Sequence, residues 1–85
     1  MAAVFEGGNY RNLTATGTIT GSGVLLGFYV NSTSAGTIAL ADGATAISGT
    51  ITPAIGFHRF PAAFGTSLVA TIGGTLNVTL LYVPA

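Results

Sequence analysis

Few side chains in this sequence could carry out chemistry. The single histidine, His58, could act as a general base if Glu6 or Asp42 oriented it beside a serine or threonine hydroxyl, as in a hydrolase triad. However, His58 lies between Phe57 and Arg59, a setting more typical of a residue flanking an interface. The two carboxylates could form a glycosidase pair only at a fixed separation, which an N-terminal position for Glu6 does not favour. We therefore predict that the protein is not an enzyme.

Cofactor, metal, nucleic-acid and membrane sites are not expected either. The chain has no cysteine, and one histidine cannot build a zinc site. No glycine-rich loop precedes a Lys-Ser or Lys-Thr pair. Two arginines without any lysine do not form the basic cluster that phosphates require. The longest apolar run, 24–30, is too short for a membrane-spanning helix, and the first residues lack the basic and apolar regions of a signal peptide.

Two groups of aromatic and basic side chains are candidate interfaces. Aromatic residues and arginine are enriched at interface hot spots, although the phenylalanines fit a core equally well. The first group lies at residues 57–60 and contains Phe57, His58, Arg59 and Phe60. The second lies in a predicted N-terminal arm, residues 1–12, which shows no strand alternation and contains Phe5, Tyr10 and Arg11. That arm is predicted either to dock onto a neighbour or to be a disordered terminus.

Charge is scarce throughout the chain. Charged residues make up 5% of the 85 residues, against about 25% in ordinary soluble domains, and the net charge is zero. The outer surface must therefore consist mainly of small neutral residues, which are easily buried against a neighbour. A domain of this size buries only about 60% of its unfolded surface. We expect a homo-oligomer; the alternative is a monomer that serine and threonine hydroxyls keep soluble.

The elements that would position these side chains are strands. Period-two alternation is frequent, and glycine and threonine weaken helices. Strands are predicted at 14–20, 24–30, 37–41, 45–52, 57–60, 67–72 and 75–83. Turns or loops are predicted at 21–23, 31–36, 42–43, around Pro61 and at 73–74. This spacing predicts an all-β chain: a compact antiparallel β-sandwich or jelly-roll-like domain of about seven to eight short strands over residues 13–85.

Two details of this pattern bear on function. Residues 24–30 are apolar on both faces, which indicates a central strand or a strand whose outer face meets another subunit. Three Asn-x-Ser/Thr triplets begin at Asn12, Asn31 and Asn77. Such triplets arise readily in a threonine-rich chain, and we interpret these asparagines as ordinary strand and loop residues.

Two stretches resemble a known group of proteins. Residues 23–42 (GVLLGFYVNSTSAGTIALAD) and 60–83 (FPAAFGTSLVATIGGTLNVTLLYV) are similar to small all-β virion proteins of tailed bacteriophages, and the resemblance covers roughly residues 9–84. It implies a capsid decoration, or cement, protein that is typically trimeric. Such a protein is made in the host cytoplasm, sits on the capsid surface and clamps neighbouring major capsid subunits. The resemblance brings no cofactor and no active residues.

Other functions stay open at this point. The chain lacks the long N-terminal arm of the commonest cement proteins, so a neck, tail or head-fibre component also fits. A carbohydrate- or surface-binding module would need exposed aromatic side chains with polar neighbours. The candidates for that role are Tyr10, Tyr29 and Tyr82, since the chain has no tryptophan.

Overall fold

The computed structural model describes residues 9–85, and every regular element in this range is a β-strand. The strands are β1 (Asn9–Leu13), β2 (Gly17–Thr20), β3 (Gly23–Asp42), β4 (Thr45–Ala46), β5 (Gly56–Phe64) and β6 (Ser67–Pro84). They form one six-stranded sheet in which all pairs are antiparallel. The predicted all-β, antiparallel class is therefore confirmed. Within the described range, no helix is long and apolar enough to span a membrane.

The two long strands, β3 and β6, organise the sheet. They pair along their whole length, from Gly23 opposite Pro84 to Asp42 opposite Leu68. Each half of this ladder has its own neighbours. β5 pairs with the first half of β3, and β1 pairs with the second half of β6. These four segments together form what we call the β1–β5 half of the sheet. β2 pairs with the first half of β6 and β4 with the end of β3, and these form the β2–β4 half.

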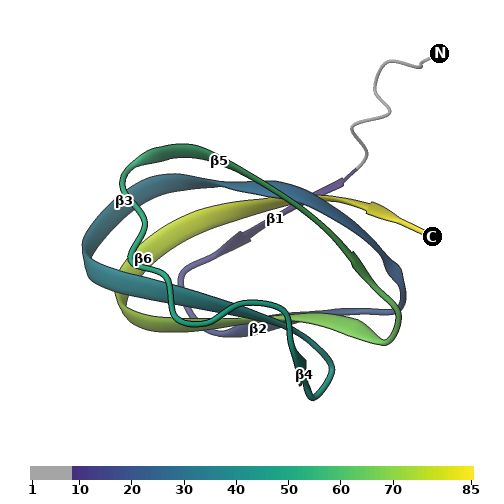
Figure 1. Cartoon of the computed structure of the whole chain (residues 1–85). Helices are drawn as coiled ribbons and strands as arrows, with labels where there is room; N and C mark the ends of the chain where they lie inside the picture. The colour runs from purple at the N-terminus through teal and green to yellow at the C-terminus, as the bar shows by residue number, and fades with distance from the viewer. Residues whose placement is uncertain (1–8) are drawn as a thin grey trace, which may run out of the picture.

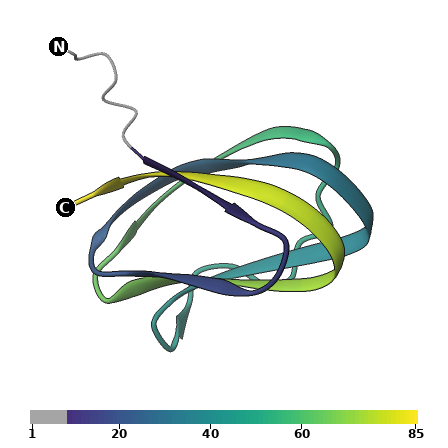
Figure 2. The ribbon, with the colours of Figure 1, turned by 180° about the vertical axis from the view of Figure 1, so that it is seen from behind.

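The sheet folds over at the middle of the long strands, so that its two halves face each other (Figures 1 and 2). The loop predicted at 31–36 and the hairpin turn predicted at 73–74 are both wrong, because β3 and β6 continue through them. The residues that allow a chain to turn also allow a paired strand to bend sharply. The sequence signals that predicted chain reversals at 31–36 and 73–74 therefore correspond to a bend within two continuous strands.

Glycine is required at this bend because the two backbones approach closely. A Cβ atom on Gly74 would lie 2.6 Å from the carbonyl oxygen of Ala35, and one on Gly36 would collide with the carbonyl oxygen of Thr75. Gly74 and Ala35 also have positive φ angles of 65° and 56°. The register shifts between Ser34 and Ala35, which marks a β-bulge on β3.

The number and length of the strands differ from the prediction. Six strands replace the predicted seven to eight, because the runs on either side of each bend join into one strand. Of the strand predicted at 45–52, only β4 is regular, although Ile51 forms an isolated bridge to Ile38. β5 extends through Pro61, where a loop was predicted. β5 pairs only with β3 among the described strands, and an edge strand tolerates proline.

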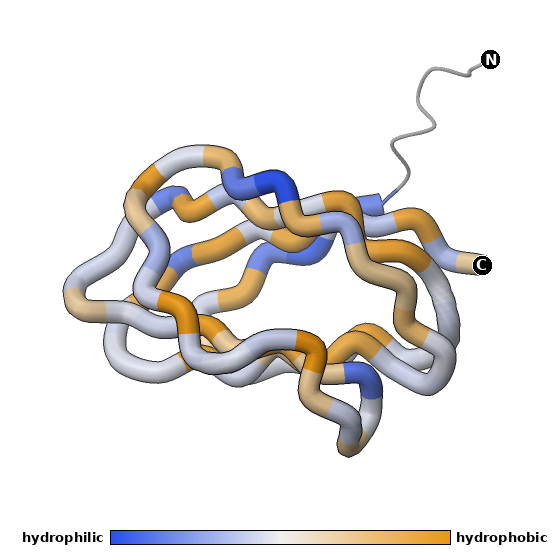
Figure 3. The backbone as a smooth tube through the Cα atoms, in the orientation of Figure 1, coloured by the Kyte–Doolittle hydropathy of each residue, from blue (hydrophilic) through white to orange (hydrophobic). Residues whose placement is uncertain are grey.

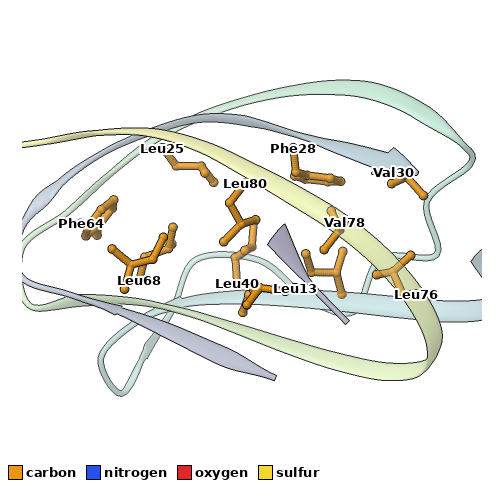
Figure 4. Packing of buried hydrophobic residues seen from close by; sticks show 13 residues of the cluster. Leu13, Leu25, Phe28, Val30, Leu40, Phe64, Leu68, Leu76, Val78 and Leu80 are labelled. Atoms are coloured by element: carbon orange, nitrogen blue, oxygen red, sulfur yellow. The ribbon is translucent and has the colours of Figure 1, made fainter. Parts of the chain in front are cut away.

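The hydrophobic core lies between the two halves (Figure 4). Apolar residues at alternating positions of the predicted strands are buried there, namely Ile19, Ile38, Leu40, Leu68, Ala70, Leu76, Val78 and Leu80. Ile47, Ile51, Ile72 and Tyr82 are partly buried against this cluster. Hydrophobic and neutral segments alternate along the chain, and strongly hydrophilic segments are few (Figure 3). Period-two alternation therefore identified these positions correctly, whereas Leu13, Leu25, Phe28, Val30 and Phe64 are core residues that it did not single out.

The predicted N-terminal arm overlaps the sheet. Residues 9–12 belong to β1, which pairs with β6 from Asn9 opposite Tyr82 to Leu13 opposite Val78. Residues 1–8, including Phe5 and Glu6, lie outside the described residues.

Candidate interaction surface

Strand alternation divides the aromatic group at 57–60 between the two sides of β5. His58 and Phe60 point toward the core, where their rings lie 5.3 and 6.3 Å from the ring of Phe28. The His58 ring also donates from Nε2 to the carbonyl oxygen of Ala54 at 2.7 Å. Phe57 and Arg59 lie on the opposite, exposed side. The four residues therefore do not form one surface.

Asp42 has a structural task at the far end of β3. Its carboxylate accepts hydrogen bonds from the backbone N–H groups of Gly65, Thr66 and Ser67 at 2.8, 2.9 and 3.3 Å. These bonds, led by the one from Gly65, hold the pKa of Asp42 below its ordinary value because they favour the charged form. Asp42 thus fastens the β5–β6 turn to the β3–β4 turn, and His58 is engaged elsewhere. No group of three His, Cys, Asp or Glu side chains within residues 9–85 could hold a metal ion.

The solvent side of the β1–β5 half, which we call the outer face, carries most of the exposed large hydrophobic side chains within residues 9–85. Tyr10 is 75% exposed, Phe57 52%, Tyr29 45% and Val24 42%. The pairing register places them on one side of the sheet. Tyr29 lies opposite Phe57 on β5, and on β6 Val24 lies opposite Val83 and Tyr10 lies opposite Leu81. The fifth exposed large hydrophobic residue, Ile55, precedes β5.

Gly27 has no side chain, and this leaves room for one of these rings to pack against β3. A Cβ atom on Gly27 would lie 2.9 Å from Cζ of Phe57 and would also collide with the carbonyl oxygen of His58. The Phe57 ring therefore lies across β3 on the outer face. Gly27 lies within the apolar run 24–30, and a glycine in a strand signals a close approach of this kind.

A cluster of amides adjoins the aromatic side chains on the outer face. Nδ2 of Asn12 on β1 donates to Oδ1 of Asn77 at 2.8 Å and to Oγ1 of Thr79 at 3.1 Å. From the other side, Nδ2 of Asn31 on β3 donates to the same two oxygens at 3.2 and 3.1 Å. Asn77 and Thr79 lie on β6, between β1 and β3. We call these four residues the amide cluster.

The outward side of the β2–β4 half is different in character. It carries small side chains, among them the exposed Thr18 on β2 and Thr71 on β6 and the half-buried Ala39 and Ala41 on β3. The register confirms that these residues share a side. Thr71 lies opposite Ala39, and Thr18 and Ala41 both lie opposite Val69, which is half-buried on the same side. Exposed aromatic side chains are therefore concentrated on one of the two outward surfaces.

Charge on the outer face is minimal. Among the described residues, Arg59 is the one charged side chain that alternation places there, at the β5 edge. Arg11 lies opposite Leu80, on the inward side of β1, and is exposed at the sheet edge.

Of the predicted interface residues, the structure thus brings Tyr10, Phe57 and Arg59 to one surface. It adds the amide cluster, which the prediction did not include. Val24 and Tyr29 also lie there, in the run 24–30, which was predicted to be either a central strand or a strand whose outer face meets another subunit, and Tyr29 is a predicted candidate for a surface-binding module. Comparison of the chain with protein-family models, curated proteins and solved structures gave no match.

Proposed function

We propose that this protein is a non-enzymatic structural component that attaches to a larger protein assembly through the outer face. The observation that carries this proposal is a group of four exposed large hydrophobic side chains, Tyr10, Val24, Tyr29 and Phe57. Among the described residues, Arg59 is the one charged side chain beside them. Interface cores are depleted in charge and enriched in aromatic residues and arginine. A contiguous apolar surface rimmed by polar groups is typical of a protein contact site.

The assembly we favour is the head of a tailed bacteriophage, in which this protein would be a capsid decoration protein. It would bind the outer shell and stabilise junctions between major capsid subunits, as the resemblance of residues 23–42 and 60–83 implies. A folded-over sheet with a continuous core suits a part that must bear load, because opening it breaks the long β3–β6 ladder. We further propose that this sheet is a jelly-roll-like sandwich and that the protein forms a homotrimer, which matches the local threefold axes of a shell.

A neck, tail or head-fibre position is the second candidate. It uses the same apolar surface against a different virion protein. The distinction therefore rests on which partner binds, and not on a different site of this chain.

The test is binding to shells assembled from the major capsid protein encoded in the same genome. We expect wild-type protein to bind saturably, and light scattering coupled to size exclusion to report a trimer. The variant carrying Tyr10→Ser and Val24→Thr should bind at least tenfold more weakly, since each buried anchor at an interface contributes about 1–2 kcal/mol or more. The matched control carries Thr18→Ser and Thr71→Ser on the β2–β4 half and should bind like wild type.

Two results would overturn the proposal. If the Tyr10/Val24 variant and the Thr18/Thr71 control bound shells equally well, the outer face would not be the contact surface. If wild-type protein did not bind shells but bound isolated necks or tails, the neck, tail or head-fibre position would replace the capsid decoration role.

A further inference from the structure

We propose that the amide cluster, together with Tyr29, is a binding site for an uncharged carbohydrate. This inference goes beyond attachment to a protein assembly and does not depend on it. Asn12, Asn31, Asn77 and Thr79 come from three neighbouring strands and meet at one place on the outer face. Their sequence positions are far apart, so only the sheet brings them together.

The hydrogen bonds of the cluster fix which atoms face outward. Both Nδ2 groups of Asn12 and Asn31 are directed to the same two acceptors, Oδ1 of Asn77 and Oγ1 of Thr79. Consequently, Oδ1 of Asn12, Oδ1 of Asn31 and Nδ2 of Asn77 have no hydrogen-bond partner among the described residues. The hydroxyl of Thr79 likewise has no acceptor for its own proton among the described residues. Two acceptors and two donor groups are thus available, and Asn12 and Asn31 are exposed.

This set of groups fits sugar hydroxyls. A hydroxyl both donates and accepts, and a carboxamide offers one group of each kind. Tyr29 lies directly opposite Thr79 and is 45% exposed, and Phe57 lies opposite Tyr29. Aromatic surface next to placed polar groups gives the C–H face of a sugar ring an apolar contact. No described residue of the cluster is charged, which favours a neutral ligand over an anionic or cationic one.

A peptide fits the site less well. Extended peptides bind mainly by adding a strand to an open sheet edge. The cluster instead is centred on β6, whose neighbours here are β1 on one side and β3 on the other. The backbone groups of β6 beneath it are therefore already paired, and β6 offers only side chains to a ligand.

The composition of these strands also points to function. Asparagine is depleted in β-strands, and local preferences are broken most often at functional sites. Here three asparagines on adjacent strands contact one another or a shared partner. The same three asparagines begin the Asn-x-Ser/Thr triplets, which the sequence alone does not distinguish from ordinary strand and loop residues.

The experiment is a screen of the full chain against an array of neutral oligosaccharides of glucose, galactose, mannose and N-acetylglucosamine, followed by calorimetric titration of the best binder. We expect saturable binding by wild-type protein and at least a tenfold loss in Asn31→Ala and in Tyr29→Ala. The matched control, Thr18→Ala, should bind like wild type. Far-UV circular dichroism verifies that each variant is folded, and if one is not, the other carries the test.

The outcomes separate this site from shell attachment. Failure of wild-type protein to bind any neutral glycan at millimolar concentration would overturn the inference, whether or not shells bind. Unchanged glycan binding by both Asn31→Ala and Tyr29→Ala would overturn it as well. Asn31→Ala should still bind shells, whereas the Tyr10/Val24 variant should still bind glycan.

Discussion

Replacing Gly36 by alanine tests the bend on which the whole fold depends. A Cβ atom at this position would collide with the backbone carbonyl oxygen of Thr75 and would lie 2.7 Å from Cβ of Leu76. Neither of these atoms is the movable end of a flexible side chain, so β3 and β6 must separate locally to admit one methyl group. Gly49 is the matched control, because a Cβ atom there would meet nothing within 4 Å.

The expected size of the effect follows from two opposing terms. Forcing an extra methyl group into a closely packed position costs about 1–3 kcal/mol. Removing a glycine restricts the unfolded chain, which stabilises the protein by about 0.4–1 kcal/mol at a position without strain. Gly36→Ala should therefore lower the free energy of unfolding by about 1–2 kcal/mol. For Gly49→Ala only the favourable term applies, so this substitution should raise the free energy of unfolding by about 0.4–1 kcal/mol.

Urea and thermal unfolding followed by far-UV circular dichroism measure this difference, since the chain has no tryptophan to report by fluorescence. For a domain of this size, 1 kcal/mol corresponds to a Tm shift of about 4–8 °C. If the two alanine variants had the same stability, β3 and β6 would not approach closely at Gly36. Residues 31–36 would then be the loop that the sequence predicts, and the account of one folded-over sheet would be refuted.

Two further predictions concern the acid range and the core. The low pKa of Asp42 means that its stabilising effect is fully present above the ordinary carboxyl value of 3.8 and is lost as pH falls through the lower folded value. Wild type should therefore exceed Asp42→Asn in free energy of unfolding at neutral pH, by a margin that shrinks in acid; a margin constant from pH 7 to pH 2 would contradict this. Leu80→Ala removes a side chain that is fully buried and should cost about 2–5 kcal/mol in urea unfolding, and a loss below about 1 kcal/mol would mean that the two halves do not close over Leu80.

The core was predictable because alternation is a local signal. In residues 67–72 and 75–83, every second position is apolar, and these positions are buried or partly buried in the structure. A one-residue slip would move the whole set to solvent, so the pattern determines which side faces the core. No knowledge of the partner strands was needed for that prediction.

Strand continuity and the outer face were not predictable in the same way. Gly73-Gly74 fits both a hairpin turn and a bend, and only the partner strand decides, through the approach of Gly74 to Ala35. The amide cluster depends on the register of three strands that are distant in sequence. Asn12 and Asn77 are 65 residues apart and become neighbours only because β1 pairs with the second half of β6. No local pattern carries that information.

The contrast between the two outward surfaces is the strongest argument that the outer face has a function. The same two strands, β3 and β6, run through both halves of the sheet. Outward positions of β3 are Val24 and Tyr29 in one half but Ala39 and Ala41 in the other. Small neutral side chains therefore satisfy the outside of this sheet, and the fold itself does not require exposed aromatic residues. Their concentration on the β1–β5 half therefore supports the proposal that this surface binds a partner. Tyr29 lies between the apolar group and the amide cluster, and it is the position where a protein partner and a sugar would compete.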